Sequence, residues 1–255
     1  MKTVTLTREA VHNGSLILVN KDNPICGGHW EGSLIPLSDK NNGVFMEARA
    51  ATVLRKLMSD LNCEDKIIAA SGFRSRDEQT RLYETSLAQN GAEFTAKYVA
   101  RPNHSEHQTG LAVDMALNQP NIDTIRPHFP YTGICGAFRA KAVKFGFTER
   151  YPKGKEHITG IAHEPWHFRY VGSPHSKIMQ ELSLTLEEYI VHLKGLSCGG
   201  KSFRYNLDDL TVEVYYHAAN EDITRIEIDT ATPYSISGDN MGGFIVTTWH
   251  GIGYV

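Results

Sequence analysis

The chain has 255 residues and a mass of 28.5 kDa, with 41% hydrophobic and 22% charged residues. This is the composition of an ordinary globular protein, and it excludes fibrous and low-complexity chains. The 26 basic residues against 29 acidic ones give a net charge of −3, so the chain lacks the basic surface typical of nucleic-acid-binding proteins, and no apolar run approaches the about 20 residues of a membrane-spanning helix.

The N-terminal residues argue against export. The first nine residues, MKTVTLTRE, contain no apolar signal region and no small-residue cleavage site. The four cysteines, Cys26, Cys63, Cys135 and Cys198, are scattered and form no CxxC pair, so we expect them to be reduced. We therefore predict a cytoplasmic protein that has no membrane anchor and binds no nucleic acid.

Hydrophobic spacing predicts both strands and helices in the first half of the chain. Apolar residues recur at helical spacing from Phe45 to Leu61, whereas Ile67–Ala70 is a short run typical of a buried strand. In chain order we expect a buried strand at 16–19, a turn-rich stretch at 22–42, a helix at 45–61, a strand at 67–70 and a helix at 76–89.

The same kind of pattern continues through the middle of the chain. Residues 111–117 (LAVDMAL) and 164–171 (EPWHFRYV) contain the β-branched and aromatic residues that strands favour. Between them we expect a surface loop at 118–134 and a helix at 138–145. This helix should end at Gly146, because glycine readily adopts the left-handed conformation that closes a helix.

The character of the sequence changes after residue 185. Thr185 and Glu188 fit a capping box, which predicts a short helix. The elements expected here are this helix at 186–193 and alternating strands at 211–216, 224–229 and 242–249. We therefore predict a domain over residues 1–185 and a small α/β appendage over 186–255. The predicted fold class is α+β, an antiparallel sheet with flanking helices, plus this β-containing appendage.

An aspartate stands inside the apolar strand predicted at 111–117. Side chains alternate along a strand, so Asp114 shares a face with Ala112 and Ala116, which are small and leave room around a carboxylate. A lone buried aspartate costs several kcal/mol unless it is paired or bound to a metal. A metal ligand, a buried salt bridge and a strand end are the interpretations open at this point.

Residues 163–167, HEPWH, match the HExxH pattern of zinc-protease helices. Pro165 argues against a helix, because proline disfavours helical geometry at the residue before it. In a strand, Glu164 and His167 would face opposite ways unless Pro165 lies at a bulge or turn. We therefore reject the helical metalloprotease motif and keep Glu164 and His167 as a functional pair.

Together with His107, these residues form a set suited to catalytic zinc. His107, Asp114 and His167 offer three nitrogen and oxygen ligands, and catalytic zinc uses three protein ligands and keeps one position open. A glutamate beside that open position, here Glu164, can serve as a general base.

Three segments resemble a known family. The pattern S-x-H-x-x-G-x-A-x-D at 105–114, the pattern E-x-W-H at 164–167 and the upstream S-G-F-R-S-x-x-x-Q at 71–79 are similar to motifs of the zinc D-alanyl-D-alanine peptidases of the VanY and VanX type. The resemblance covers roughly residues 10–182. Without a signal or anchor, the chain is most similar to the cytoplasmic bifunctional D,D-dipeptidase/D,D-carboxypeptidases (VanXY-like) of vancomycin resistance.

The resemblance implies a role for each matching residue. His107, Asp114 and His167 would bind Zn²⁺, Glu164 would be the general base, and Arg74 would stabilise the tetrahedral oxyanion. The implied substrate-binding residues are Gln79, Ser105, Ser71 and Trp166, although Ser71 also fits a plain turn residue and Trp166 also fits core packing.

The implied reaction is hydrolysis of the D-Ala-D-Ala bond, in the free dipeptide and at the ends of peptidoglycan precursor peptides, which contributes to glycopeptide (vancomycin) resistance. Two alternatives remain. One is a cell-wall endopeptidase that cuts an L,D or cross-bridge linkage, since sequence does not show pocket depth. The other is a catalytically silent zinc module that binds a peptide, against which the presence of Glu164 and Arg74 speaks.

Overall fold

A computed structural model describes residues 1–27, 33–37, 43–198, 200–207 and 209–251. The chain divides into two compact units, and each is described by itself. The larger unit comprises Val19–Pro24 and His29–Thr185, and the smaller unit comprises Met1–Leu18, Ile25–Gly28 and Leu186–Val255. Parts of the turn-rich stretch predicted at 22–42, namely 28–32 and 38–42, lie outside the described residues.

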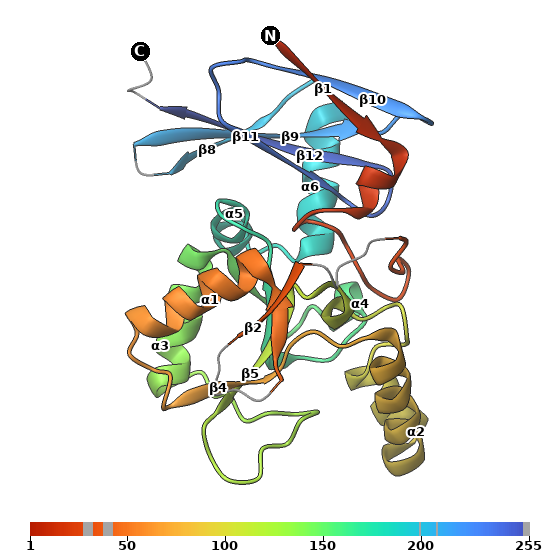
Figure 1. Cartoon of the computed structure of the whole chain (residues 1–255), viewed down its shortest axis with the longest axis vertical. Coiled ribbons are helices and arrows are strands. Elements are labelled where there is room, and N and C mark those ends of the chain that lie inside the picture. Colours follow the sequence, from red (N-terminus) through yellow and green to blue (C-terminus); the bar gives the residue numbers. More distant parts are fainter. Residues whose placement is uncertain (28–32, 38–42, 199, 208, 252–255) are drawn as a thin grey trace. The chain divides into compact units, whose positions relative to one another are not determined.

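The larger unit is built on a four-stranded antiparallel sheet (Figure 1). Its order is β4 (Ile67–Ser71), β5 (Ala112–Leu117), β7 (Glu164–Tyr170) and β6 (Phe147–Tyr151). Among the described residues of this unit, the two remaining strands, β2 (Leu34–Pro36) and β3 (Phe45–Glu47), form a small antiparallel sheet. The central strands β5 and β7 are buried along nearly their whole length, so any polar side chain on them lies in the interior.

Helices flank this sheet. They are α1 (Ala48–Asp60), α2 (Arg76–Tyr98), α3 (Gly133–Ala142), α4 (Glu156–Thr159) and α5 (His175–Glu181). In α1 the Glu47 side chain accepts a hydrogen bond from the Ala50 amide as an N-cap. A capping box formed by Ser75 and Glu78 begins α2, which kinks at Gly91, where φ is 80°.

Several predicted boundaries differ from the structure. The helix predicted at 45–61 begins only at Ala48, because Phe45–Glu47 pair with β2. The helix predicted at 76–89 continues to Tyr98, and the helix predicted at 138–145 begins earlier, at Gly133. Residues 16–19 are buried as predicted but form no strand. The predicted stop at Gly146 is confirmed, with φ of 84°.

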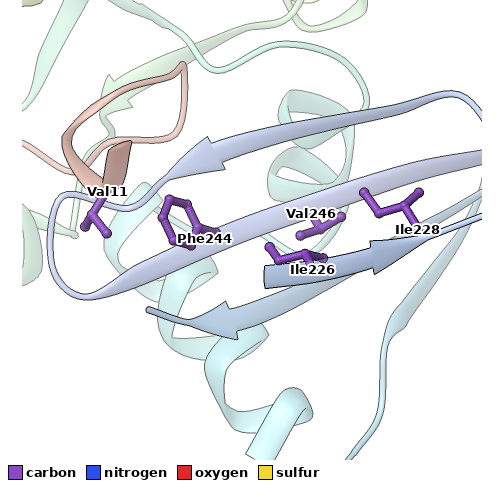
Figure 2. Close-up of a cluster of buried hydrophobic side chains, with 5 residues drawn as sticks. All are labelled: Val11, Ile226, Ile228, Phe244 and Val246. Carbon is purple, nitrogen blue, oxygen red and sulfur yellow. The ribbon is translucent and has the colours of Figure 1, made fainter. Parts of the chain in front are cut away.

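The smaller unit contains two sheets that share a core. The four-stranded sheet has the order β11 (Tyr234–Gly238), β12 (Gly243–Gly251), β9 (Leu210–Ala218) and β8 (Phe203–Leu207), and α6 (Leu186–Cys198) packs on β9. The two-stranded sheet pairs β1 (Lys2–Thr7) with β10 (Ile223–Ile228). Figure 2 shows the side chains buried between them: Val11, Ile226, Ile228, Phe244 and Val246.

The pairing of β1 with β10 divides the chain differently from the predicted domains. Residues 1–18 were expected to belong with residues up to 185, yet they lie in the smaller unit with 186–255. All six residues of β1, from Lys2 to Thr7, pair with β10, more than 200 positions away. Local hydrophobic spacing carries no information about so distant a partner, so the sequence pattern could not reveal this arrangement.

Two further features concern membrane-spanning helices and the cysteines. Within the described ranges, no helix is long and apolar enough to cross a membrane. Cys63 and Cys135 are free thiols, as predicted, while the side chain of Cys198 lies outside the described part of the chain.

Candidate active site

Neighbouring strands bring two of the predicted metal ligands together. Asp114 on β5 lies in register with His167 on β7, and on its other side with Ser71 on β4. The Asp114 Oδ1 atom is 2.9 Å from His167 Nδ1. An antiparallel ladder thus brings side chains 53 positions apart into contact, because directly opposed residues share one face of the sheet.

The third predicted ligand comes from a short 3-10 helix, η3 (Glu106–Thr109). His107 Nδ1 is 2.7 Å from the carbonyl oxygen of Gly72, which accepts its proton. His107 Nε2 is therefore left without a proton and faces Asp114 Oδ2 at 3.1 Å. Gly110 ends this turn with φ of 70°, and a Cβ there would lie 2.9 Å from the Glu47 amide nitrogen, so glycine is required for both conformation and space.

These three residues form a buried donor cluster. One ligand atom from each of His107, Asp114 and His167 lies within 4.8 Å of the others. All three side chains are less than a tenth exposed. Two imidazole nitrogens and a carboxylate oxygen at this spacing fit a catalytic zinc site, whose remaining position is open. The residues present therefore fit the metal that the sequence pattern implies.

A fourth buried residue, Glu106, was not predicted to belong to the site. Its Oε2 atom is 3.5 Å from His167 Nε2. Its Oε1 atom accepts hydrogen bonds at 2.8 Å from Arg150 on β6 and from Arg169 on β7. Glu106 is fully buried, and the two arginines hold its pKa far below the usual value although burial alone would raise it. The only local signal was its place beside His107 in the S-E-H segment.

Glu164, the predicted base, begins β7. Its Oε2 atom is 3.8 Å from His167 Nδ1. Between β6 and β7 the register shifts, since Glu149 opposes Phe168 but Tyr151 opposes Glu164. This irregularity around Pro165 explains how residues three apart on one strand reach the same cluster. Burial raises the pKa of Glu164 to about 8.

Arg74 lies beside the cluster, just after β4. Its Nη2 atom is 3.6 Å from Asp114 Oδ2, and its backbone amide donates to the His107 carbonyl oxygen at 3.2 Å. Its Nη1 atom donates to Gln79 Oε1 at 2.9 Å, and Gln79 Nε2 donates in turn to the Ala100 carbonyl oxygen at 2.7 Å. Arg74 Nε is buried and has no hydrogen-bond partner in the described structure.

Electrostatics distinguish the two histidines. Burial, followed by the nearby Arg74 guanidinium, lowers the pKa of His107 to about 4. Burial also lowers the pKa of His167, but hydrogen bonds to Asp114 and Glu106 outweigh it and raise this pKa to about 9. Without a metal, His167 therefore shares its protons with two carboxylates. A bound cation would replace the proton on the nitrogen that faces Asp114.

The three candidate metal ligands, Glu164 and Arg74 line one pocket, which we call the catalytic pocket. Of the predicted site residues, it is lined by Arg74, Gln79, Ser105, His107, Asp114, Glu164, Trp166 and His167. Ser71 is not among its described lining residues; it pairs with Asp114 through the strand ladder instead. Tyr151, whose ring centroid is 4.8 Å from that of His167, also lines the pocket and was not predicted.

Known proteins share these features. The VanY family, described as D-alanyl-D-alanine carboxypeptidase, matches residues 43–173. The chain is 39% identical over 176 residues to the bifunctional D-Ala-D-Ala dipeptidase and D-Ala-D-Ala carboxypeptidase VanXYC of Enterococcus gallinarum, covering 69% of this chain and 93% of that protein.

Two solved structures are similar as well. The vancomycin resistance D,D-dipeptidase VanXYg, crystallised with a D-Ala-D-Ala phosphinate analog, matches with a TM-score of 0.94 and 47% identity over 98% of this chain and 99% of that one. A mutant of the D,D-pentapeptidase VanY in complex with Zn(II) matches with a TM-score of 0.58 and 31% identity over 69% of this chain and 98% of that one. The predicted α+β fold and the predicted resemblance are thereby confirmed, and the chain belongs to the VanY family of D-alanyl-D-alanine carboxypeptidases.

Proposed function

We propose that this protein is a zinc-dependent peptidase that hydrolyses the D-Ala-D-Ala bond, both in the free dipeptide and at the end of peptidoglycan precursor peptides, and so contributes to glycopeptide (vancomycin) resistance. The observation that carries the proposal is the buried cluster of His107, Asp114 and His167 in one pocket with Glu164 and Arg74. Similarity to a bifunctional dipeptidase and carboxypeptidase supports both substrate lengths.

His107, Asp114 and His167 would hold the metal. When bound there, zinc would act as a Lewis acid on the scissile carbonyl and on the attacking water. The protein supplies the orientation: the Gly72 carbonyl fixes the His107 ring, and Glu106 fixes the His167 ring. Such supporting contacts commonly determine which nitrogen faces the metal.

Glu164 is the proposed general base. It is buried beside His167 and lines the catalytic pocket, where it can accept a proton from water and return it to the departing amino group. A pKa raised to about 8 by burial lies close to neutral pH, where a carboxylate passes a proton on most effectively. A cation at the adjacent cluster would lower this pKa and keep the carboxylate ionised before the reaction.

Arg74 is the proposed partner of the oxyanion. Arg74 lines the catalytic pocket, and its Nε atom is buried without a hydrogen-bond partner in the described structure. A fixed cation in such surroundings stabilises developing negative charge most strongly. Both ends of the Gln79 amide are used within the protein, so we propose that Gln79 positions Arg74. Ser105 and Trp166 are the proposed substrate contacts in the wall; Ser71 would act only through its neighbour Asp114.

The test is hydrolysis by the purified protein. Release of D-alanine is measured from D-Ala-D-Ala and from a pentapeptide that ends in D-Ala-D-Ala, with L-Ala-L-Ala and an L,D-linked peptide as controls. We expect the first two to be cleaved and the L,L-dipeptide to remain intact, because mispositioning a reacting group by about 1 Å can cost 10²-fold in rate. A chelator should abolish the activity, and added Zn²⁺ should restore it.

Other outcomes would favour one of the two alternative functions. Cleavage of the L,D linkage alone would favour the endopeptidase alternative, and metal binding without any turnover would favour a silent peptide-binding module. We further propose a cytoplasmic location, which immunoblotting of cytoplasmic, membrane and culture fractions tests directly.

A further inference from the structure

A second pocket adjoins the catalytic pocket in the larger unit. It has a cavity volume of about 360 Å³, which is within the range of small-ligand sites. Four residues line both pockets: Val99, Ala100, Tyr151 and Ile161. The two pockets therefore border one another, and a ligand too long for the catalytic pocket has this space directly beside it.

Part of this second pocket is formed by the short segment Val19–Pro24, which we call the excursion. Val19–Pro24 belongs to the larger unit, although the residues before and after it belong to the smaller one. Three residues of this segment, Asn20, Lys21 and Asp22, line the pocket. The Asn20 carbonyl oxygen accepts a hydrogen bond at 2.8 Å from His104 Nδ1, another lining residue. The excursion is thus held against the pocket by a specific contact.

The stem of Lys21 runs past Gly160. It passes so close to Gly160 that a Cβ at that glycine would lie 3.3 Å from Lys21 Cδ. The ammonium group itself stays accessible, since the Lys21 side chain is 69% exposed. A stem that runs along the protein while its charge stays accessible is an arrangement by which lysine presents its ammonium group at the edge of a site.

Positive charge predominates around this pocket. Lys21, Arg101 and His104 are its basic lining residues, and Asp22 is its acidic one. Asp22 is 3.9 Å from the Lys21 ammonium, but both side chains are largely exposed, so the pair is weak. Arg101 is exposed and has no ion pair with any described residue. Its guanidinium is available to a ligand.

Resting on the proposed function, we propose that this second pocket, the upstream subsite, binds the part of a longer peptide that precedes D-Ala-D-Ala, and that Lys21 and Arg101 select peptides carrying a carboxylate there. A dipeptide held by the catalytic pocket has no such part. The upstream subsite would therefore govern the efficiency of carboxypeptidase cleavage and leave dipeptide cleavage unaffected.

The experiment compares matched substrates. A set of pentapeptides ends in D-Ala-D-Ala and carries one glutamate, or glutamine in its place, at each of the three upstream positions in turn. The kcat/KM of each pair is measured for the wild-type holoenzyme, the double variant Lys21→Gln/Arg101→Gln, and the control Lys153→Gln, which alters a lysine in a different pocket. Free D-Ala-D-Ala is assayed alongside, and the affinity for each peptide is measured by calorimetry with a chelator present.

We expect glutamate to be preferred at one upstream position by about threefold to tenfold in wild type and in Lys153→Gln, the range that one or two accessible ion pairs provide. The preference should fall with added salt and vanish in the double variant, while kcat/KM for the dipeptide changes by less than about twofold. Equal treatment of glutamate and glutamine by wild type at every position would overturn the upstream subsite, as would an equal loss on dipeptide and pentapeptide. If no peptide is hydrolysed, the proposed function is wrong. The difference in calorimetric affinity between glutamate and glutamine peptides then still tests the upstream subsite.

Discussion

The Glu106 carboxylate contacts the His167 ring at the nitrogen that faces away from Asp114, with 3.5 Å between Oε2 and Nε2. The other ring nitrogen, Nδ1, is thereby turned toward Asp114 at 2.9 Å. A carboxylate behind a metal-binding histidine fixes both its tautomer and its orientation. Because Arg150 and Arg169 in turn fix Glu106, the orientation of His167 depends on a fully buried ionic network.

Glu106→Gln should therefore weaken metal binding. The substitution keeps the size of the side chain but removes the negative charge between two buried arginines, and loss of such a supporting carboxylate typically costs 10–100-fold in metal affinity. Unfolding should also become easier by about 3–5 kcal/mol, because two buried cations lose their partner. Competition with a chromogenic chelator measures the affinity, and urea titration measures the stability.

A matched control separates the two effects. Glu149 is a less deeply buried glutamate that also pairs with an arginine, with 2.7 Å to Arg139 Nε, but it makes no contact with the cluster among the described residues. Glu149→Gln should lower stability and leave zinc affinity unchanged. Equal losses of zinc affinity in both variants would mean that Glu106 acts only through the general stability of the fold.

Replacing a metal ligand and replacing the general base should have different effects on bound zinc. His167→Ala removes one of three ligands and should abolish both bound zinc and turnover. Glu164→Gln should retain one zinc per chain, measured by atomic emission, yet lower kcat by about 10²–10⁴-fold, because no group remains to accept the proton. Glu164→Gln activity within a few-fold of wild type would remove Glu164 from the mechanism.

Arg74 and Gln79 should behave as a coupled pair. Arg74→Ala should keep the zinc and lower kcat more than it raises KM, since its contact strengthens as the oxyanion forms. Gln79→Leu should produce a smaller loss of the same kind, because it only frees the guanidinium to move. In the double variant the Gln79 effect should disappear. Additive losses would instead show that Gln79 contacts the substrate itself.

The sequence predicted the members of the cluster because they belong to short local motifs. His107 and Asp114 lie seven positions apart around a glycine turn, and Glu164 and His167 share a short strand. A lone aspartate in an apolar strand is costly enough to demand a partner. These local anomalies, together with the family resemblance, sufficed to select the residues that the structure brings into one pocket.

The features that the sequence did not predict depend on contacts between strands that are far apart in the chain. Arg150, Arg169 and Tyr151 lie on ordinary strand patterns, and only the sheet order places them beside Glu106 and His167. The same holds for β1, whose partner β10 is more than 200 residues away. Hydrophobic periodicity reports which face of an element is buried, but not which element covers it.

The division into two units leads to a prediction about truncation. A chain of residues 19–185 contains every residue of the catalytic pocket and should bind one zinc and hydrolyse D-Ala-D-Ala. A chain of residues 1–185 retains β1 without β10, so it presents an unpaired strand and should aggregate more readily. Light scattering and zinc content distinguish the two. A monomeric, zinc-loaded 19–185 chain without activity would mean that the smaller unit shapes the site.

A histidine that is not among the described lining residues of the catalytic pocket should control stability in acid. His175, at the start of α5, is 4% exposed, and burial lowers its pKa to about 3. Its unfolded pKa is about 6.5, so between these values the unfolded chain binds the extra proton. The stabilisation is complete above about pH 6.5 and is lost as the pH falls, by up to about 1.4 kcal/mol per unit. Urea titrations at pH 7.5 and pH 5.0, with a chelator present, measure this loss.

The decisive quantity is the change in unfolding free energy between the two pH values, because a substitution at a buried site also alters stability at neutral pH. His175→Gln should reduce that change by about 2 kcal/mol, since the unfolded chain then has one fewer proton to gain over about 1.5 pH units. His157→Gln, which removes an exposed histidine, should leave the change as it is in wild type. Identical pH dependence in both variants would show that His175 is protonated in the folded protein as easily as in the unfolded one, and that its burial does not exclude the charge.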